Sequence, residues 1–320
     1  MQVKNILYGS VYSFKEIKNS KIFYSFLIFA LILISGSYFV SQTSFISQGR
    51  IMVDFSIFAI TIFNIFIGIF IGSSIIYDDI EKKSIYLSIT RPVKRAEYLI
   101  GRFLGLTVAI IFSTIIMMLI FYFVLLIMHK YVIPFKPFAG QSKPAVSHLK
   151  SIHGNSVKES KNAPNKSIIQ KTKAKPFTVY SLPQPLIIQA IFIIIESVFI
   201  AAVALLFSLI TSKALASIFT VLIFFIGNVS SKMNDLVRPV KKIIGGKTVI
   251  VHQANHLLTN IVHIIYTVLP NFSIFNISSE AAYKIFISAG TVFYRIVYGL
   301  SYMVLLVIIS SLIFARKDIS

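Results

Sequence analysis

A single carboxyl group inside an apolar run is the first candidate for chemistry in this sequence. Glu196 interrupts the run Ile191–Ile200, whose other residues are aliphatic or aromatic apart from Ser197. A charge at the centre of a membrane span costs about 2.5–3.5 kcal/mol, so we expect Glu196 to face the interior of a helix bundle or a wet cavity. Asn64, at a similar estimated depth in another apolar segment, is the expected neighbour. A protonated Glu196 that links two helices through a hydrogen bond is an equally favoured alternative to a role in transport.

Histidine spacing provides a second candidate, a metal site. His252 and His256 would lie one turn apart on a helix, but His263 would lie about 10 Å further along its axis. No acidic residue lies beside them, and the Glu of the zinc-protease motif is missing. We therefore expect no metal site. His252 and His256 are the residues that would hold one, and we interpret them as polar residues at a membrane interface.

Other residues for catalysis are scarce. The chain has no Cys, which excludes disulfides, thiolate metal ligands and Cys nucleophiles. Gly246-Lys247-Thr248 is similar to the end of a phosphate-binding P-loop, but Lys241 stands where that motif requires Gly. We therefore expect no catalytic residue and no nucleotide site in this chain.

The third candidate is the charged stretch YDDIEKKSIYLSITRPVKRAEYLIGRFLG, which lies between two apolar segments. Asp78 and Glu81 have capping-box spacing, so a short helix is expected just after the preceding apolar segment. Pro92 interrupts it, and a second helix is expected from about Val93. Such a short amphipathic helix, held between two membrane spans, is a docking element rather than a catalytic one; a solvated loop is the alternative.

Long apolar helices must position these residues. The chain of 320 residues is 56% hydrophobic and 13% charged, with a mean hydropathy of +0.82, whereas soluble domains are about 25% charged. A bilayer core of about 30 Å requires about 20 apolar residues in a helix. The segments that qualify, of which the fifth is the shortest, are Ile22–Val40, Phe55–Ile76, Phe103–Met128, Leu186–Ile210, Ala214–Val229 and Thr291–Phe314. We predict an all-α integral membrane protein, a six-transmembrane-helix bundle in a single domain (residues 1–320).

The remaining segments complete this architecture. In residues 1–21, Ser13 and Glu16 have capping-box spacing and predict the start of a helix that lies on the membrane. Residues 130–183 are expected to form a flexible basic loop. Residues 230–290 contain LLTNIVHIIYTVL, which is too short to span and predicts a re-entrant or interfacial helix before the last span.

Charge distribution indicates the orientation. The net charge is +20. With the N-terminus inside, 13 Lys and Arg residues lie inside and 17 outside, but the inner ones lie in short flanks, whereas 16 of the outer ones lie in two long loops. Because the positive-inside rule applies to short loops and span ends, we expect both termini in the cytoplasm. We expect this charge to contact anionic lipid headgroups rather than nucleic acid. The pairs Gly68/Gly72 and Gly101/Gly105 predict close helix packing.

The charged stretch resembles the coupling helix of the permease subunits of type-2 ABC exporters. The residues that fill that pattern are Glu81, Ser84, Ile85, Pro92, Arg95, Leu99, Gly101 and Arg102. Phe14-Lys15-Glu16 is similar to the family's N-terminal interface helix, and Leu269-Pro270-Asn271-Phe272 to its Leu-Pro-Asn segment before the last span. The chain's ending, Phe314-Ala315-Arg316-Lys317-Asp318, also resembles that of the family.

This resemblance implies a multi-pass permease of the plasma (inner) membrane that works as a homo- or heterodimer with a separate ABC ATP-binding subunit. ATP would be bound by that subunit, and this chain would carry no cofactor. Residues 78–96 would form the cytosolic coupling segment, with coupling to the ATPase through Glu81, Ser84, Ile85, Pro92 and Arg95. Pro270 and Asn271 would belong to an outer gate segment, and Glu196 and Asn64 would be translocation path candidates.

Two other functions are compatible with the sequence. One is a non-transporting membrane anchor or scaffold whose basic loop binds a polyanion, and this alternative predicts no ATPase partner. The other, less favoured, is a membrane-embedded enzyme. It would need a nucleophile, an acid pair or a metal triad at one depth, and only the lone Glu196 and the loosely spaced histidines are available.

Overall fold

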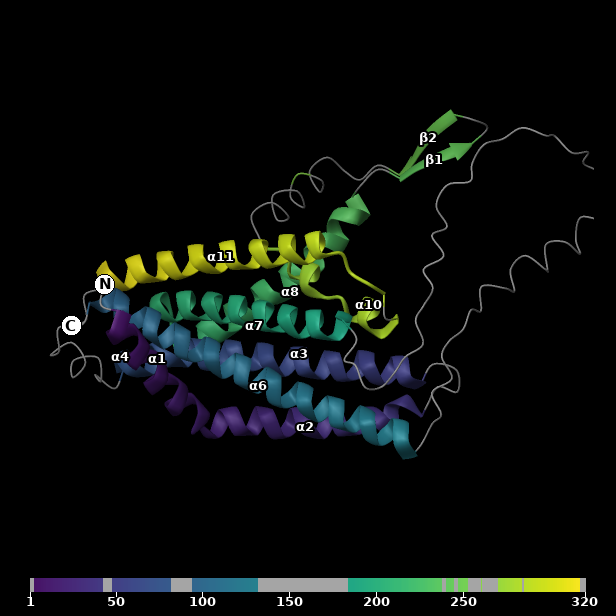
Figure 1. Ribbon diagram of the computed structural model, residues 1–320. Helices are drawn as coiled ribbons and strands as arrows, with labels where there is room; N and C mark the ends of the chain where they lie inside the picture. The colour runs from purple at the N-terminus through teal and green to yellow at the C-terminus, as the bar shows by residue number, and fades with distance from the viewer. Residues whose placement is uncertain are drawn as a thin grey trace, which may run out of the picture. The chain divides into compact units, whose positions relative to one another are not determined.

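The computed structural model describes residues 3–42, 48–81, 94–131, 184–237, 240–244, 247–252, 260, 270–283 and 285–316. Residues Met1–Val124 and Pro183–Ser320 form one compact unit and Leu125–Leu182 a second, and every contact described below lies within the first. The elements, labelled in Figure 1, are α1 (Val3–Lys18), α2 (Lys21–Ser41), α3 (Gln48–Ile75), α4 (Tyr77–Glu81), α6 (Arg95–Tyr131), α7 (Gln184–Ile210), α8 (Lys213–Val237), β1 (Val240–Ile244), β2 (Lys247–His252), η1 (Phe272–Phe275), α10 (Ser278–Tyr283) and α11 (Ala289–Arg316).

Membrane-spanning helices dominate the described residues, which confirms the predicted fold class. Within the described ranges, five stretches are long and apolar enough to cross a bilayer: Lys21–Ser41, Arg50–Glu81, Arg95–Ile127, Gln184–Ile210 and Ala289–Arg316. In α8 the apolar part covers only Lys213–Val229. The fifth predicted span, Ala214–Val229, therefore stays a prediction.

A β-hairpin between α8 and η1 was not predicted. β1 pairs with β2 in antiparallel register, with Ile244 opposite Lys247. Lys247 and Thr248 thus lie in a strand, whereas the same residues of a P-loop open a helix. His252 ends β2, so the helical spacing assumed for a metal site is wrong at that residue, and His256 lies outside the described residues. No group of His, Asp and Glu side chains in the described part of the chain could hold a metal ion.

The core is centred on α7, which packs side by side with α3 and also contacts α8 and α11 (Figure 1). The α3–α7 contact depends on the small residues of the Gly68/Gly72 pair. A methyl group added to Gly68 would lie 2.8 Å from the carbonyl oxygen of Ser197, so the two helix backbones touch there. The predicted close approach is confirmed at this pair.

The N-terminal helix differs from the prediction in where it begins. α1 begins at Val3, so Ser13 and Glu16 lie inside a continuous helix and do not start one. The residue that caps a helix is Ser20, whose Oγ accepts a hydrogen bond of 3.2 Å from the amide of Phe23 at the start of α2. The capping-box interpretation of Ser13 and Glu16 is wrong, because the same i, i+3 spacing also places two residues on one side of a helix.

Candidate functional site

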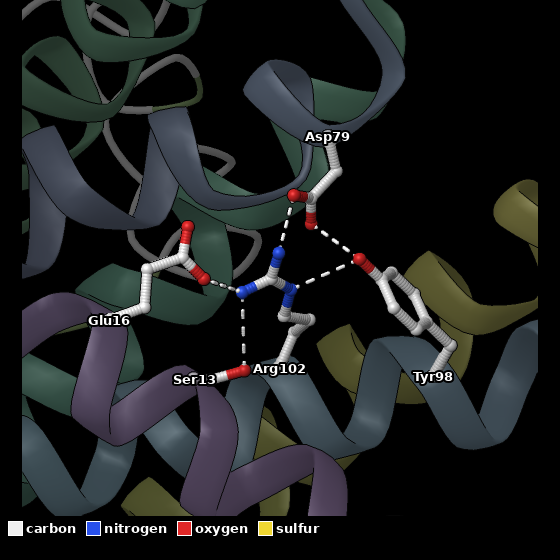
Figure 2. Close-up of polar contacts among 5 residues, drawn as sticks. All are labelled: Ser13, Glu16, Asp79, Tyr98 and Arg102. Atoms are coloured by element: carbon white, nitrogen blue, oxygen red, sulfur yellow. Dashed lines mark hydrogen bonds and ion pairs between the residues drawn. The ribbon is translucent and has the colours of Figure 1, made fainter. Parts of the chain in front are cut away.

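A buried arginine joins the two ends of the charged stretch to the N-terminal helix (Figure 2). Arg102 lies in the second turn of α6 and is 5% exposed. Its guanidinium donates to the carboxylates of Glu16 on α1 and of Asp79 on α4. It also donates to Tyr98 Oη at 3.1 Å and to Ser13 Oγ at 3.4 Å. We call these five residues the Arg102 cluster.

Within the cluster the acceptors and donors complement one another. Tyr98 Oη accepts from Arg102 Nε and donates to Asp79 Oδ2 at 2.7 Å, so all three side chains are linked in a closed set. The guanidinium carbon also lies 5.6 Å from the ring centroids of both Tyr12 and Tyr98. Cation–π contacts of this kind are favourable for a desolvated Arg. The cluster thus compensates the charge of Arg102, which would otherwise be costly to bury.

The two carboxylates differ in exposure. The side chain of Asp79 is 8% exposed and that of Glu16 is 52% exposed, against 6% for Arg102. A buried ion pair depends strongly on both partners, whereas a half-exposed carboxylate is partly solvated by water or headgroups. We conclude that Arg102 and Asp79 form the permanent core of the cluster and that Glu16 is its more separable member.

The sequence brings α1 onto α6 through a glycine. A methyl group on Gly105 would lie 2.7 Å from the carbonyl oxygen of Ser10 and would overlap the Cβ of Ser13. The helices can therefore approach to backbone contact only with Gly at this position. This approach places Ser13 and Glu16 within reach of Arg102, one turn earlier on α6.

A second ion pair connects the charged stretch to the α7–α8 connection. Lys213, the first residue of α8, lies 3.2 Å from Asp78 Oδ1 on α4. Both side chains are about one-third exposed or more, so the pair contributes little stability by itself. The pair matters for where it lies. Asp78 connects α4 to α8, and the adjacent Asp79 connects α4 to α6.

The predicted coupling residues lie around this cluster. α4 ends at Glu81 and α6 begins at Arg95, so these two residues flank residues 82–94. Ser84, Ile85 and Pro92 lie outside the described residues. α4 follows α3 almost without interruption, and Asp78 is its second residue and not a cap. The rest of the helix predicted from Asp78 and Glu81 lies outside the described residues.

The translocation path candidates do not pair with each other. Asn64 Oδ1 accepts from Ser113 Oγ at 2.5 Å and from Thr114 Oγ1 at 3.2 Å, and its Nδ2 donates to the carbonyl of Ile60 at 2.9 Å. Asn64 therefore links α3 to α6, and no hydrogen bond joins it to Glu196 among the described residues. Glu196 is 4% exposed on α7 and has no hydrogen-bond or ion-pair partner among the described residues.

Pro270 and Asn271, the predicted outer gate residues, directly precede η1. Asn271 caps this helix, because its Oδ1 accepts from the amide of Ser273 at 3.1 Å and from Ser273 Oγ at 2.6 Å. The amide of Asn271 donates to Tyr298 Oη on α11 at 2.9 Å. The segment is thus ordered by its own side chains and attached to α11.

Sequence reasoning missed the Arg102 cluster although it used three of its members for other purposes. Asp79 and Tyr98 were not singled out at all. The available signal was the presence of charges of opposite sign, at Glu16, Asp79 and Arg102, each close to the end of an apolar segment.

Comparison with known families gives one match over nearly the whole chain. Residues 4–319 match the model of a family described as ABC-2 family transporter protein. No curated protein matches the chain significantly.

Proposed function

The chain belongs to the ABC-2 family of transporter proteins, and from this premise we propose that it is the membrane-spanning permease subunit of an ATP-driven exporter. A separate ABC subunit would bind and hydrolyse ATP and would dock on residues 78–96. Two permease copies would form the pore in the plasma membrane, with both termini in the cytoplasm. The chain's basic surfaces would contact anionic lipid headgroups.

The observation that carries this proposal is the Arg102 cluster. It ties α4, at one end of the segment 82–94, to α6 at the other end, and ties both to α1. A partner that pushes on this segment would therefore displace three helices together instead of bending a loop. α4 continues α3, and α3 packs along α7 in the core, so the same displacement would reach the centre of the bundle.

The experiment replaces Arg102 by Met, which removes the charge and keeps most of the side-chain volume. We expect Arg102→Met to insert in the membrane but to lose co-purification of the ATP-binding subunit, or to hydrolyse ATP without transport. Glu81→Ala and Arg95→Ala should weaken docking in the same assay without disturbing the cluster.

The matched control is Arg50→Met, which removes an arginine from a partly exposed i, i+4 pair with Asp54 at the start of α3. It should behave like the parent. Normal coupling in Arg102→Met would contradict the proposed path of motion. Failure of any ATP-binding subunit to co-purify with the parent would contradict the permease function itself and favour the scaffold alternative.

A further inference from the structure

An open groove runs along α2 from the first residue of that helix. It has a volume of about 510 Å³ and is lined by Lys21, Tyr24, Ser25, Ile28 and Phe29. At about 100° per residue these side chains share one face of the helix, and the buried Ala30 and Ile34 lie on the opposite face. α2 packs on α3 and lies at the edge of the bundle (Figure 1). The groove therefore faces the surroundings of the protein and not its core.

Polarity changes along this face of α2. Lys21 begins the helix, the next turn adds the hydroxyls of Tyr24 and Ser25, and the exposed side chains beyond them on this face are apolar up to Ile32. Lys21 and Ile32 lie about 16 Å apart along the axis, at about 1.5 Å per residue. This length is close to half of a bilayer core of about 30 Å. The face thus spans one leaflet, with its polar end at the membrane surface.

The polar groups of the groove are available to a ligand. Ser25 is exposed and its hydroxyl makes no hydrogen bond among the described residues, whereas Ser37 and Ser41 of the same helix donate to carbonyls three residues earlier, at 2.6 and 2.7 Å. Within the same described ranges Lys21 has no ion pair and the hydroxyl of Tyr24 no hydrogen bond. One end of the groove therefore presents a cation and two hydroxyl groups, which together suit a phosphate group.

Positive charge gathers around this end of the groove. Lys15 and Lys18 are exposed on the last turn of α1 and precede Lys21. Glu16 is the only acidic residue between positions 3 and 42, and its carboxylate already binds Arg102. Lysines beside a membrane surface attract anionic headgroups. The excess charge therefore favours an anionic headgroup over a zwitterionic one.

A second copy of the chain fits this face less well than a lipid does. In a symmetric dimer both copies keep the same depth in the membrane, so the lysine ends of two such grooves would meet. No acidic residue lines the groove to compensate them, and juxtaposed like charges are unfavourable. An amphiphile from the bilayer, in contrast, neutralises the lysine end and leaves its outer side among other lipids.

We propose that this groove is a site for one anionic glycerophospholipid of the leaflet next to the α1–α2 turn. Its phosphate would lie at Lys21 and Ser25, and an acyl chain would follow the apolar turns up to Ile32. The proposal deepens the expected contact with anionic headgroups by assigning a fixed site and a lipid class. It rests on the proposed function only in that the chain spans a membrane, and it requires neither transport nor an ATP-binding subunit.

The test measures contact with lipid at the groove through a single fluorophore. The chain has no Trp, so Ile32→Trp places one at the apolar end, where the native side chain is 60% exposed. The full-length protein is reconstituted in vesicles of phosphatidylcholine and phosphatidylglycerol. In one series the phosphatidylglycerol carries brominated acyl chains, which quench Trp on contact, and in the other series the phosphatidylcholine does. Comparison of the two series gives the preference for anionic lipid at this position.

In this background phosphatidylglycerol should be preferred by about fivefold or more, and Lys21→Gln should lower the preference about fivefold. Lys21→Arg keeps the charge and should stay within about twofold of the parent. The matched control reporter is Leu305→Trp on α11, 54% exposed and as many residues from Arg316 at the end of its helix as Ile32 is from Lys21. Lys21→Gln should not change the lipid preference there.

Equal quenching by the two lipids at Ile32→Trp would overturn the site, because the groove would then be solvated by any lipid. An unchanged preference in Lys21→Gln would overturn it as well, and so would an equal loss at Leu305→Trp, which would indicate a general effect of surface charge. Absence of quenching by either lipid would show that a second copy covers the face. Ser35→Trp, one turn further on the same exposed face, carries the test if Ile32→Trp does not yield folded protein.

Co-purification of the ATP-binding subunit is measured separately. The lipid site can therefore fail while co-purification supports the permease function, or hold while co-purification contradicts it.

Discussion

Replacing the two carboxylates that bind Arg102, one at a time, should cost very different amounts of stability. The side chains of Asp79 and Arg102 are 8% and 6% exposed, whereas that of Glu16 is 52% exposed. Removing one partner of a buried pair costs about 3–5 kcal/mol because an uncompensated charge stays buried. An exposed pair contributes about 0–1 kcal/mol. We therefore expect Asp79→Asn to lower the free energy of unfolding by about 3 kcal/mol and Glu16→Gln by less than about 1 kcal/mol.

A double variant separates the ion pair from simple packing. In Asp79→Asn with Arg102→Met no unpaired charge remains buried, so part of the loss should be recovered. We expect the double variant to be at least about 1 kcal/mol more stable than the sum of the two single effects predicts. Glu16→Gln with Arg102→Met should show a smaller interaction energy, because Glu16 is already half solvated.

Thermal unfolding of the purified protein in one detergent, followed by light scattering because the chain has no Trp, provides the measurement. A loss of 1 kcal/mol lowers Tm by about 1.5 °C in a chain of 320 residues. Asp79→Asn should thus melt about 4–5 °C below the parent, and Glu16→Gln within about 1.5 °C of it. Equal shifts for the two carboxylates, or strict additivity in the first double variant, would refute the ranking by burial.

Further substitutions test the orientation, the packing of α1 and the buried carboxyl. Ser84→Cys should react with an impermeant maleimide only after the membrane is permeabilised, whereas Ser156→Cys should react in intact cells. The opposite pattern would exclude docking of a cytosolic ATPase on residues 78–96. Gly105→Ala should destabilise the protein by about 1–3 kcal/mol through overlap with α1, and a Tm equal to that of the parent would show that α1 does not need this contact. Glu196→Gln should insert and dimerise normally but change transport or its pH dependence, and Glu196→Leu should leave Tm within a few degrees because no hydrogen bond is lost among the described residues. Full transport by both Glu196 variants would remove Glu196 from the translocation path.

Hydropathy was sufficient to predict five of the six proposed spans because bilayer thickness sets helix length directly. The glycine pairs were equally informative, since a missing side chain has one main steric consequence. Both Gly68 and Gly105 lie at helix contacts. These features depend on local sequence alone, and local sequence is what periodicity and composition report.

The partners of the polar residues could not be predicted because they depend on how distant helices face one another. Arg102 is 86 residues from Glu16 and 23 from Asp79. Asn64 was assigned a neighbour from estimated depth, but depth does not specify which face of a helix a residue occupies, and the hydrogen bonds of Asn64 to Ser113 and Thr114 could not be predicted. The segment 82–93, with three of the predicted coupling residues, stays a prediction from the resemblance.

The distance in sequence between the members of the Arg102 cluster has a consequence for biogenesis. Glu16 is synthesised 86 residues before Arg102, which at about 5–20 residues per second is an interval of about 4–17 s. During that time α1 has no α6 to pack on, and its exposed Leu7, Tyr8 and Val11 suit it to wait at the membrane surface. α1 thus completes its docking only after α3 and α6 have been inserted. A defect in Arg102 should accordingly appear as a delay in maturation, with α1 open to proteases, before it appears as a loss of transport.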